Sequence, residues 1–245
     1  LYSFSIDLTA RCNLNCKHCY INLPAKDQIS KVKELSLEEI EAIADQAVAL
    51  GAVWVLLTGG EPLLRPDFLD IYLMLKRKGL LVSVFTNATL IQTKHIDLFK
   101  NYPPRDIETT IYGSNQLTYE TVTRQSGSFD AFTRGLKALF DAGIRVRLKA
   151  MALHSNLTDL DAIADFGRRY TKDFYRFDPI LHLRYDRDEK RNEEIRAERL
   201  TPDEIVQLER SDPKRFESLK NHCDVYFIES MKNRADDHLF NCGTG

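Results

Sequence analysis

The chain has 245 residues, 43% of which are apolar, and a formal net charge of −2. This composition suffices for one large or two small domains with a sizeable core, and the near-neutral charge gives no bulk attraction to nucleic acid or an anionic membrane. The longest apolar run, residues 47–57, is too short to cross a bilayer, which takes about 20 residues. No signal-peptide pattern opens the chain. We therefore expect no nucleic-acid or membrane partner. The five cysteines, three of them too close together for a disulfide framework, favour a reducing, cytoplasmic compartment.

Predicted strands and helices alternate along the chain. Residues 2–8 favour a strand, and residues 35–51 favour a helix that begins with a capping box of Ser36 and Glu39 and ends at Gly51. The later strands are predicted at 53–58, 80–86, 106–112, 144–151 and 174–181, with helices at 66–79, 128–143 and 157–170. Buried strands alternating with helices indicate a parallel sheet. About six β/α units fall short of an eight-unit barrel. We predict an α/β fold, a partial (β/α)6 barrel, and keep a doubly wound open sheet as the alternative.

The composition of the sequence changes after Tyr185. Residues 186–199 are densely charged and are expected to form a solvated loop or a surface helix. Residues 201–210 predict a helix with Thr201 as N-cap and Pro202 at its first position. We therefore predict a barrel domain over residues 1–185, followed over residues 186–245 by a charged linker, a helix and a short irregular C-terminal extension.

Cys12, Cys16 and Cys19 directly follow the first predicted strand. They are too close together for an ordinary disulfide framework, and their loop lies at the strand's carboxyl end, where active sites of parallel α/β folds gather. A structural zinc site recruits four protein ligands. A [4Fe–4S] cluster is usually held by four thiolates, so three cysteines would leave one iron open. Zinc with His18 or a distant group as fourth ligand stays the alternative, because thiolates suit either metal.

A second motif, GGEP at residues 59–62, follows the second predicted strand. Consecutive glycines let the backbone approach a ligand closely and adopt positive φ, and Pro62 stiffens the turn. Glu61 would repel an anion and suit an ammonium group. A simple turn is the alternative interpretation.

The CxxxCxxC pattern of Cys12, Cys16 and Cys19, with GGEP one β/α unit later, resembles the radical S-adenosylmethionine (radical SAM) enzymes over nearly residues 3–185. The resemblance favours the partial barrel. It implies that the three cysteines hold a [4Fe–4S] cluster whose open iron binds the amino and carboxylate groups of S-adenosylmethionine. An electron from the cluster would then cleave the sulfonium, and the 5′-deoxyadenosyl radical would abstract hydrogen from a substrate.

The resemblance also implies roles for neighbouring residues. His18 occupies a position that is typically aromatic and lies near the adenine. In the family, the segment that matches Gly59, Gly60, Glu61 and Pro62 contacts the methionyl amino group.

Further cofactor contacts are implied by weaker matches. Thr86 and Asn87 belong to a segment that resembles one near the adenosine, although Ala88 replaces its usual glycine. Thr110 would face the ribose or carboxylate side of the cofactor.

Arg124 lies in a segment that resembles one in the family whose arginine pairs with the methionyl carboxylate. A guanidinium group suits this role, because it can donate two parallel hydrogen bonds to a carboxylate. An exposed arginine at a helix start is the alternative. Lys149 and Asn156, near the end of the fifth predicted strand, are also candidates.

The end of the chain, residues 238–245, resembles the start of the SPASM extension, which binds auxiliary iron–sulfur clusters. Cys242 would be its first ligand, and Cys223 is either another ligand or a buried apolar thiol. The further cysteines of such a domain are missing from these residues. We therefore expect either a truncated copy or one without a complete auxiliary cluster.

Radical enzymes with this extension mostly modify ribosomally synthesised peptides, so we expect a peptide maturase of the oxidoreductase type. An open barrel with charged rim residues such as Arg184, Asp186 and Arg187 suits a polymeric substrate. A small substrate would more often require an enclosed apolar pocket. A separate leader-peptide recognition protein and an electron donor such as ferredoxin or flavodoxin are the expected partners. The alternatives are a radical enzyme of tetrapyrrole or other small-molecule maturation, and a zinc-binding interaction protein without catalysis.

Overall fold

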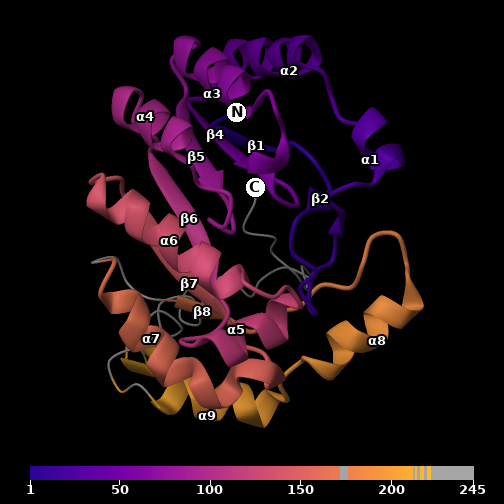
Figure 1. The fold of residues 1–245 in the computed structure, drawn as a ribbon, viewed down its shortest axis with the longest axis vertical. Coiled ribbons are helices and arrows are strands. Elements are labelled where there is room, and N and C mark those ends of the chain that lie inside the picture. The colour runs from indigo at the N-terminus through magenta and orange to yellow at the C-terminus, as the bar shows by residue number, and fades with distance from the viewer. Residues whose placement is uncertain (172–175, 212, 214–215, 218–219, 222–245) are drawn as a thin grey trace, which may run out of the picture. The chain divides into compact units, whose positions relative to one another are not determined.

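A computed structural model of the chain describes residues 1–171, 176–211, 213, 216–217 and 220–221 (Figure 1). The chain divides into two compact units, Leu1–Arg199 and Leu200–Gly245. The first unit therefore ends after Arg199, whereas the sequence placed the boundary after Tyr185. Cys223 and Cys242 lie outside the described residues, as does the first part of the strand predicted at 174–181.

A parallel six-stranded sheet forms the centre of the first unit. Its order is β1-β4-β5-β6-β7-β8, which is also the order along the chain. The strands are β1 (Ser3–Asp7), β4 (Trp54–Thr58), β5 (Leu81–Phe85), β6 (Asp106–Ile111), β7 (Val146–Met151) and β8 (Arg176–Asp178). A doubly wound sheet reverses its strand order at a switch point, and this sheet does not. The winding confirms the predicted partial barrel.

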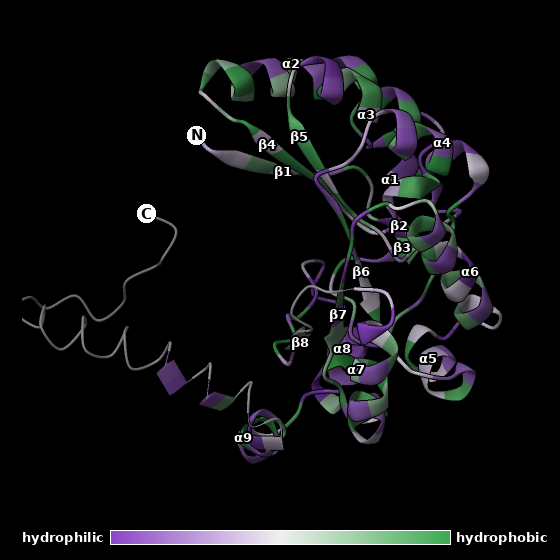
Figure 2. Ribbon diagram, turned by 90° about the vertical axis from the view of Figure 1, so that its left-hand side faces the viewer, coloured by the Kyte–Doolittle hydropathy of each residue, from purple (hydrophilic) through white to green (hydrophobic). Residues whose placement is uncertain are grey.

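Helices connect successive strands and lie on the outer side of the curved sheet (Figure 2). The connecting helices are α2 (Leu37–Ala49), α3 (Phe68–Arg77), α4 (Thr93–Asn101), α5 (Gln116–Thr123), α6 (Ser128–Asp141) and α7 (Leu160–Arg168). Shorter elements are β2 (Arg11–Cys12), β3 (Leu23–Pro24), α1 (Gln28–Val32), η1 (Pro62–Leu64) and η2 (His154–Asp159). The chain then continues through α8 (Glu189–Ala197) and, in the second unit, α9 (Pro202–Ser211). Among the described residues, no helix is both long and apolar enough to span a membrane.

Local sequence signals explain most of these elements. Ser36 accepts from the N–H of Glu39, and the Glu39 side chain accepts from the N–H of Ser36, so the predicted capping box begins α2. The predicted cap of α9 is also present, since the Thr201 hydroxyl accepts from the N–H of Glu204. The core lies between the helices and the sheet, where the fully buried Phe68, Ile71, Tyr72 and Leu75 of α3 form one face.

Two helices and one surface differ from the sequence prediction. The pattern assigned no helix to α4 or α5. In α5, β-branched residues lower the helix propensity, and burial of Tyr119 and Val122 supplies the stability instead. The segment 186–199, expected to form a solvated loop or a surface helix, contains the helix α8, and the difference is that Asn192 and Ile195 on one side of it are buried.

Candidate active site

A cavity of about 330 Å³ lies at the carboxyl ends of the six strands. Its walls come from the loop after β1 and from the ends of β4, β5, β6, β7 and β8. The lining residues with polar side chains or glycine are Cys12, Cys16, His18, Cys19, Tyr20, Thr58, Gly59, Gly60, Thr86, Asn87, Glu108, Thr110, Tyr112, Lys149, Asp178 and His182. The volume falls within the range of about 300–1,000 Å³ that is usual for ligand pockets.

The cysteine loop is attached to two other parts of the first unit. Its start pairs with β3 through β2, and its middle is held by the end of α5, because the N–H groups of Asn15 and Lys17 donate to the carbonyls of Thr123 and Val122, each at 3.0 Å. Cys16 is buried, and Cys12 and Cys19 are half-buried. The loop therefore directs all three thiols into one cavity.

The three thiols fit an iron–sulfur cluster better than a single metal ion. Within the described part of the chain, no three His, Cys, Asp or Glu side chains are grouped so as to hold one metal ion. A cluster takes its thiolates at separate irons, so its ligands need not converge on a point. Burial raises the pKa of Cys12 to about 12 and that of Cys16 well above its usual range. A cationic iron centre would supply the positive charge that stabilises the thiolates.

The two glycines of the GGEP motif bring that loop against the segment that leads from β1 into the cysteine loop. A Cβ at Gly59 would lie 2.3 Å from the carbonyl oxygen of Thr9, and one at Gly60 would lie 2.3 Å from that of Arg11. Of the pair, only Gly59 has positive φ, at 129°. The sequence had indicated close approach to a ligand. The structure shows close approach to the chain's own backbone, while both glycines also line the cavity.

Glu61 and Pro62 do not line the cavity. The Glu61 carboxylate is fully buried and accepts from the hydroxyl of Thr86 at 2.7 Å, the N–H of Asn87 at 2.8 Å and the N–H of Leu63 at 3.0 Å. Burial raises the pKa of Glu61 to about 7, although the three hydrogen bonds oppose this. These partners differ from the ammonium group that the sequence suggested.

Asn87 joins the GGEP loop to the cysteine loop. Its side-chain amide donates to Asn13 Oδ1 at 3.0 Å and lies 3.7 Å from Cys12 Sγ. The next residue, Ala88, is fully buried with φ 60°, a left-handed conformation that favours glycine. Ala88 therefore adopts a backbone conformation that suits the glycine found at this position in the family motif.

His18 presents an unsatisfied polar atom in the cavity wall. Among the described residues, its buried Nδ1 has no hydrogen-bond partner, and its ring lies 5.2 Å from that of Tyr112. Burial lowers the pKa of His18 to about 4, so the imidazole is neutral near pH 7. Such an atom fits a hydrogen-bonding group of a bound cofactor.

An ion pair lies across the cavity wall between β6 and β7. Lys149 Nζ lies 2.7 Å from Glu108 Oε1 and 4.9 Å from the centre of the Phe85 ring. Thr110 and Lys149 were predicted from the sequence, whereas Tyr20, Thr58, Glu108, Tyr112, Asp178 and His182 were missed. For Glu108 and Tyr112 a signal was available: Asp106, Glu108, Thr110 and Tyr112 alternate with apolar or small residues in a strand expected to be buried on both faces.

Arg124 and Asn156 are not among the residues that line the cavity. Arg124 follows the last turn of α5, not the start of a helix, and its guanidinium pairs with Glu194 at 2.8 Å. Asn156 is fully buried, and its amide donates to the carbonyls of Met151 and Tyr112. Both side chains tie elements of the fold together.

Comparison with known proteins agrees with this geometry. A model of the Radical SAM superfamily matches residues 6–167. Fe-coproporphyrin III synthase of Methanosarcina barkeri (strain Fusaro / DSM 804) is 34% identical over 159 residues, covering 65% of this chain and 39% of that protein. The antilisterial bacteriocin subtilosin biosynthesis protein AlbA of Bacillus subtilis (strain 168) is 27% identical over 197 residues, covering 76% and 43%.

The crystal structure of Streptococcus suis SuiB bound to precursor peptide SuiA shares the fold, with a TM-score of 0.62 at 17% identity over 71% of this chain and 38% of that one. This chain thus spans less than half the length of each of the three proteins. The family match covers more than half of the chain and includes the cysteine loop, the GGEP loop and the strands from β4 to β7. The chain belongs to the Radical SAM superfamily.

Proposed function

We propose that this chain is the radical-generating part of an enzyme that modifies a ribosomally synthesised peptide by hydrogen abstraction. The family uses a [4Fe–4S] cluster and S-adenosylmethionine, which together supply a radical able to remove a hydrogen atom from a substrate. The observation that carries the proposal is the convergence of Cys12, Cys16 and Cys19 with the ends of the parallel strands on one cavity. Two of the similar proteins also support a peptide substrate: AlbA is named as a bacteriocin biosynthesis protein, and SuiB was crystallised bound to a precursor peptide.

Each part of the cavity has a task in this proposal. Cys12, Cys16 and Cys19 ligate the cluster. Asn87 orients Cys12, and Nδ1 of His18 forms a hydrogen bond with the cofactor. The half-buried backbone of Gly59 and Gly60 lines the cavity without side chains, which gives the methionyl part of S-adenosylmethionine close access to main-chain groups.

The wall on the β6 and β7 side completes the cofactor site. Thr110 supplies a hydroxyl there, and Lys149 and Glu108 supply charges of opposite sign.

The side of the cavity next to β8 has exposed apolar and aromatic side chains that suit a peptide. Ile180 is 66% exposed and Tyr185 78% exposed, and the ring of Tyr20 lies 5.3 Å from that of Tyr185. Of the charged rim residues expected from the sequence, Asp186 and Arg187 are exposed, but Arg184 is buried and points into the protein. The apolar side chains are therefore a better basis for peptide binding than the charged rim.

A tetrapyrrole is the second candidate substrate, because Fe-coproporphyrin III synthase is 34% identical to this chain. That match covers 65% of the chain, against 76% for AlbA. The SPASM subgroup, a leader-recognition protein, a ferredoxin or flavodoxin donor and a cytoplasmic location complete the proposal and rest on the family resemblance.

Deuterium transfer distinguishes the two substrates. The full chain is reconstituted with iron and sulfide under anaerobic conditions and incubated with S-adenosylmethionine, a reductant and either a deuterated precursor peptide encoded beside its gene or a deuterated tetrapyrrole precursor of Fe-coproporphyrin III. We expect deuterium from the peptide in 5′-deoxyadenosine, measured by mass spectrometry. Deuterium from the tetrapyrrole alone would replace the first proposal with the second, and absence of 5′-deoxyadenosine in both reactions would contradict enzyme function.

A further inference from the structure

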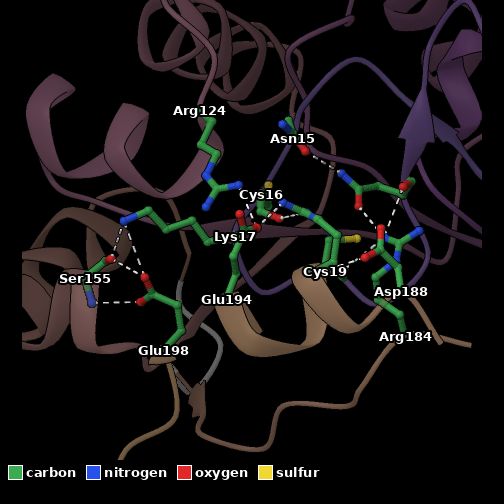
Figure 3. Close-up of polar contacts among 12 residues, drawn as sticks. Asn15, Cys16, Lys17, Cys19, Arg124, Ser155, Arg184, Asp188, Glu194 and Glu198 are labelled. Atoms are coloured by element: carbon green, nitrogen blue, oxygen red, sulfur yellow. Dashed lines mark hydrogen bonds and ion pairs between the residues drawn. The ribbon is translucent and has the colours of Figure 1, made fainter. Parts of the chain in front are cut away.

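Two arginines that follow β8, Arg184 and Arg191, reach back to the cysteine loop near the start of the chain, and Figure 3 labels the first of them. Arg191 Nη2 donates to the carbonyl of Cys16 at 2.9 Å. Arg184 Nη1 donates to the carbonyls of Cys19 and Asn22 at 3.4 and 3.2 Å, and to Asn22 Oδ1 at 3.1 Å. The main chain of two of the three predicted cluster ligands is therefore held by guanidinium groups.

The loop is also held on its other side. Lys17 donates to the hydroxyl of Ser155 at 2.9 Å and lies 3.4 Å from Glu198, and Figure 3 shows its side chain extending toward both. Glu198 accepts in turn from the N–H of Ser155 at 2.9 Å. The loop thus lies between residues of β8–α8 and the start of η2, with its sulfurs in the cavity.

The charges of this network are unevenly distributed. Arg184 pairs with Asp186, and Lys17 pairs with Glu198, so each of these pairs is neutral. Glu194, however, pairs with both Arg191 at 2.6 Å and Arg124 at 2.8 Å. One carboxylate therefore serves two guanidinium groups, while the fourth carboxylate of the network, Asp188, accepts from the backbone N–H of Arg191 at 3.2 Å. The network is neutral as a whole, and it places the Arg191 guanidinium on the carbonyl of Cys16. The Arg191 side chain is only 15% exposed, so water screens its charge incompletely.

We propose that Arg191 is a positioning residue that raises the reduction potential of the iron–sulfur centre. Its hydrogen bond fixes the backbone of Cys16, and its charge favours the more negative, reduced state of a cluster held by three thiolates. The residues Glu194 and Arg124 tune this charge. The proposal goes beyond the choice of substrate, because it concerns electron entry and applies to a peptide or a tetrapyrrole alike.

Three variants of the full chain separate charge from hydrogen bonding. Arg191→Gln removes the charge and keeps an N–H donor, whereas Arg191→Lys keeps the charge. Arg196→Gln is the matched control, because Arg196 lies on the same helix, pairs with Glu189 and is 43% exposed. Each protein is reconstituted anaerobically, its iron is counted, and its midpoint potential is measured by a redox titration followed by electron paramagnetic resonance.

We expect Arg191→Gln to lower the equilibrium constant for reduction by about tenfold, which is ~59 mV for a one-electron couple. Arg191→Lys and Arg196→Gln should stay close to the unmodified protein. An unchanged potential in Arg191→Gln at full iron content would overturn the proposal, as would an equal decrease in Arg196→Gln.

Glu194→Gln keeps the proposal testable if Arg191→Gln binds too little iron to titrate. This variant removes the shared negative charge and leaves Arg191 and Arg124 in place. We expect the potential to rise, opposite in sign to the effect of Arg191→Gln. An unchanged or lower potential in Glu194→Gln would show that the network only supports the loop mechanically and would overturn the electrostatic role.

Discussion

Asn87 connects the two motifs that the sequence singled out. Its N–H donates to Glu61, and its side-chain amide donates to Asn13 and contacts Cys12. Because the Glu61 carboxylate is fully buried, its hydrogen bonds are unscreened and hold Asn87 in one position. Glu61 thereby acts on the cysteine loop through Asn87, whereas a direct contact with the cofactor was the simpler expectation.

Glu61→Gln tests this internal role. The NH2 group of the glutamine would replace one carboxylate oxygen and face the N–H of either Asn87 or Leu63. That N–H would then have lost its acceptor. We expect the free energy of unfolding of the apo-protein to fall by about 1–3 kcal/mol in urea titrations. Glu38→Gln, at an exposed position of α2, is the control and should change it by less than about 0.5 kcal/mol. Equal stability of Glu61→Gln and the unmodified protein would mean that the three hydrogen bonds do not hold the loop.

The residues that the sequence identified are those whose spacing encodes the chemistry. Cys12, Cys16 and Cys19 lie within one loop, so their convergence follows from local spacing alone. The contact of Arg191 with Cys16 joins residues 175 positions apart. The sequence of the charged segment 186–199 does not indicate which arginine turns inward. A long side chain can bury its apolar stem and carry its charge to an acceptor far away in the sequence, and local spacing does not reveal that acceptor.

Helix α4 shows how one element depends on a side chain that does two tasks. His95 is 2% exposed, and its Nδ1 accepts from the N–H of Gln92 at 3.1 Å, which caps the first turn. Its ring also packs edge-on against Phe68 of α3 at 6.1 Å. Burial, reinforced by the charge of Lys94, lowers the pKa of His95 to about 4. The helix start is therefore built for the neutral imidazole.

Stability should consequently fall in acid. Between pH 6.5 and about 4, the unfolded chain binds a proton at His95 that the folded protein does not, so the free energy of unfolding decreases as the pH falls through this window. The full loss is about 3 kcal/mol. His95→Gln keeps an acceptor for the N–H of Gln92 and removes the titration. Urea titrations at several pH values should show a shallower slope in the variant, and identical slopes would contradict the assignment.

Elements with strong local signals were predicted, and those made by tertiary contacts were not. The capping box of α2 and the apolar strands β4 and β5 are encoded in their own residues. Helix α5 begins after an Asn115 cap, but the stability of the helix depends on the burial of Tyr119 and Val122. Such burial depends on partners far along the chain, which periodicity cannot identify.

At the scale of the whole first unit, the segment after β8 completes the site that begins after β1. The two strands are at opposite edges of the sheet, yet Arg184 joins their following loops through Asn22 and Cys19. Ile195 of α8 is fully buried in an apolar cluster with Val122, Leu153 and Leu181. The charged segment is therefore part of the barrel unit, which explains why the unit ends at Arg199.

Two fragments test this boundary, one ending at Tyr185 and one at Arg199. The shorter fragment lacks Arg191 and Ile195, so it loses the hydrogen bond to Cys16 and exposes the apolar cluster. We expect it to be less stable by at least about 2 kcal/mol in urea titrations and to bind less iron after reconstitution. Both fragments retain every residue that lines the cavity. The longer one also keeps Arg191 and Ile195, so it should match the full chain in both measurements. If the two fragments were equally stable and bound equal amounts of iron, α8 would be an appendage, and the site would be complete without it.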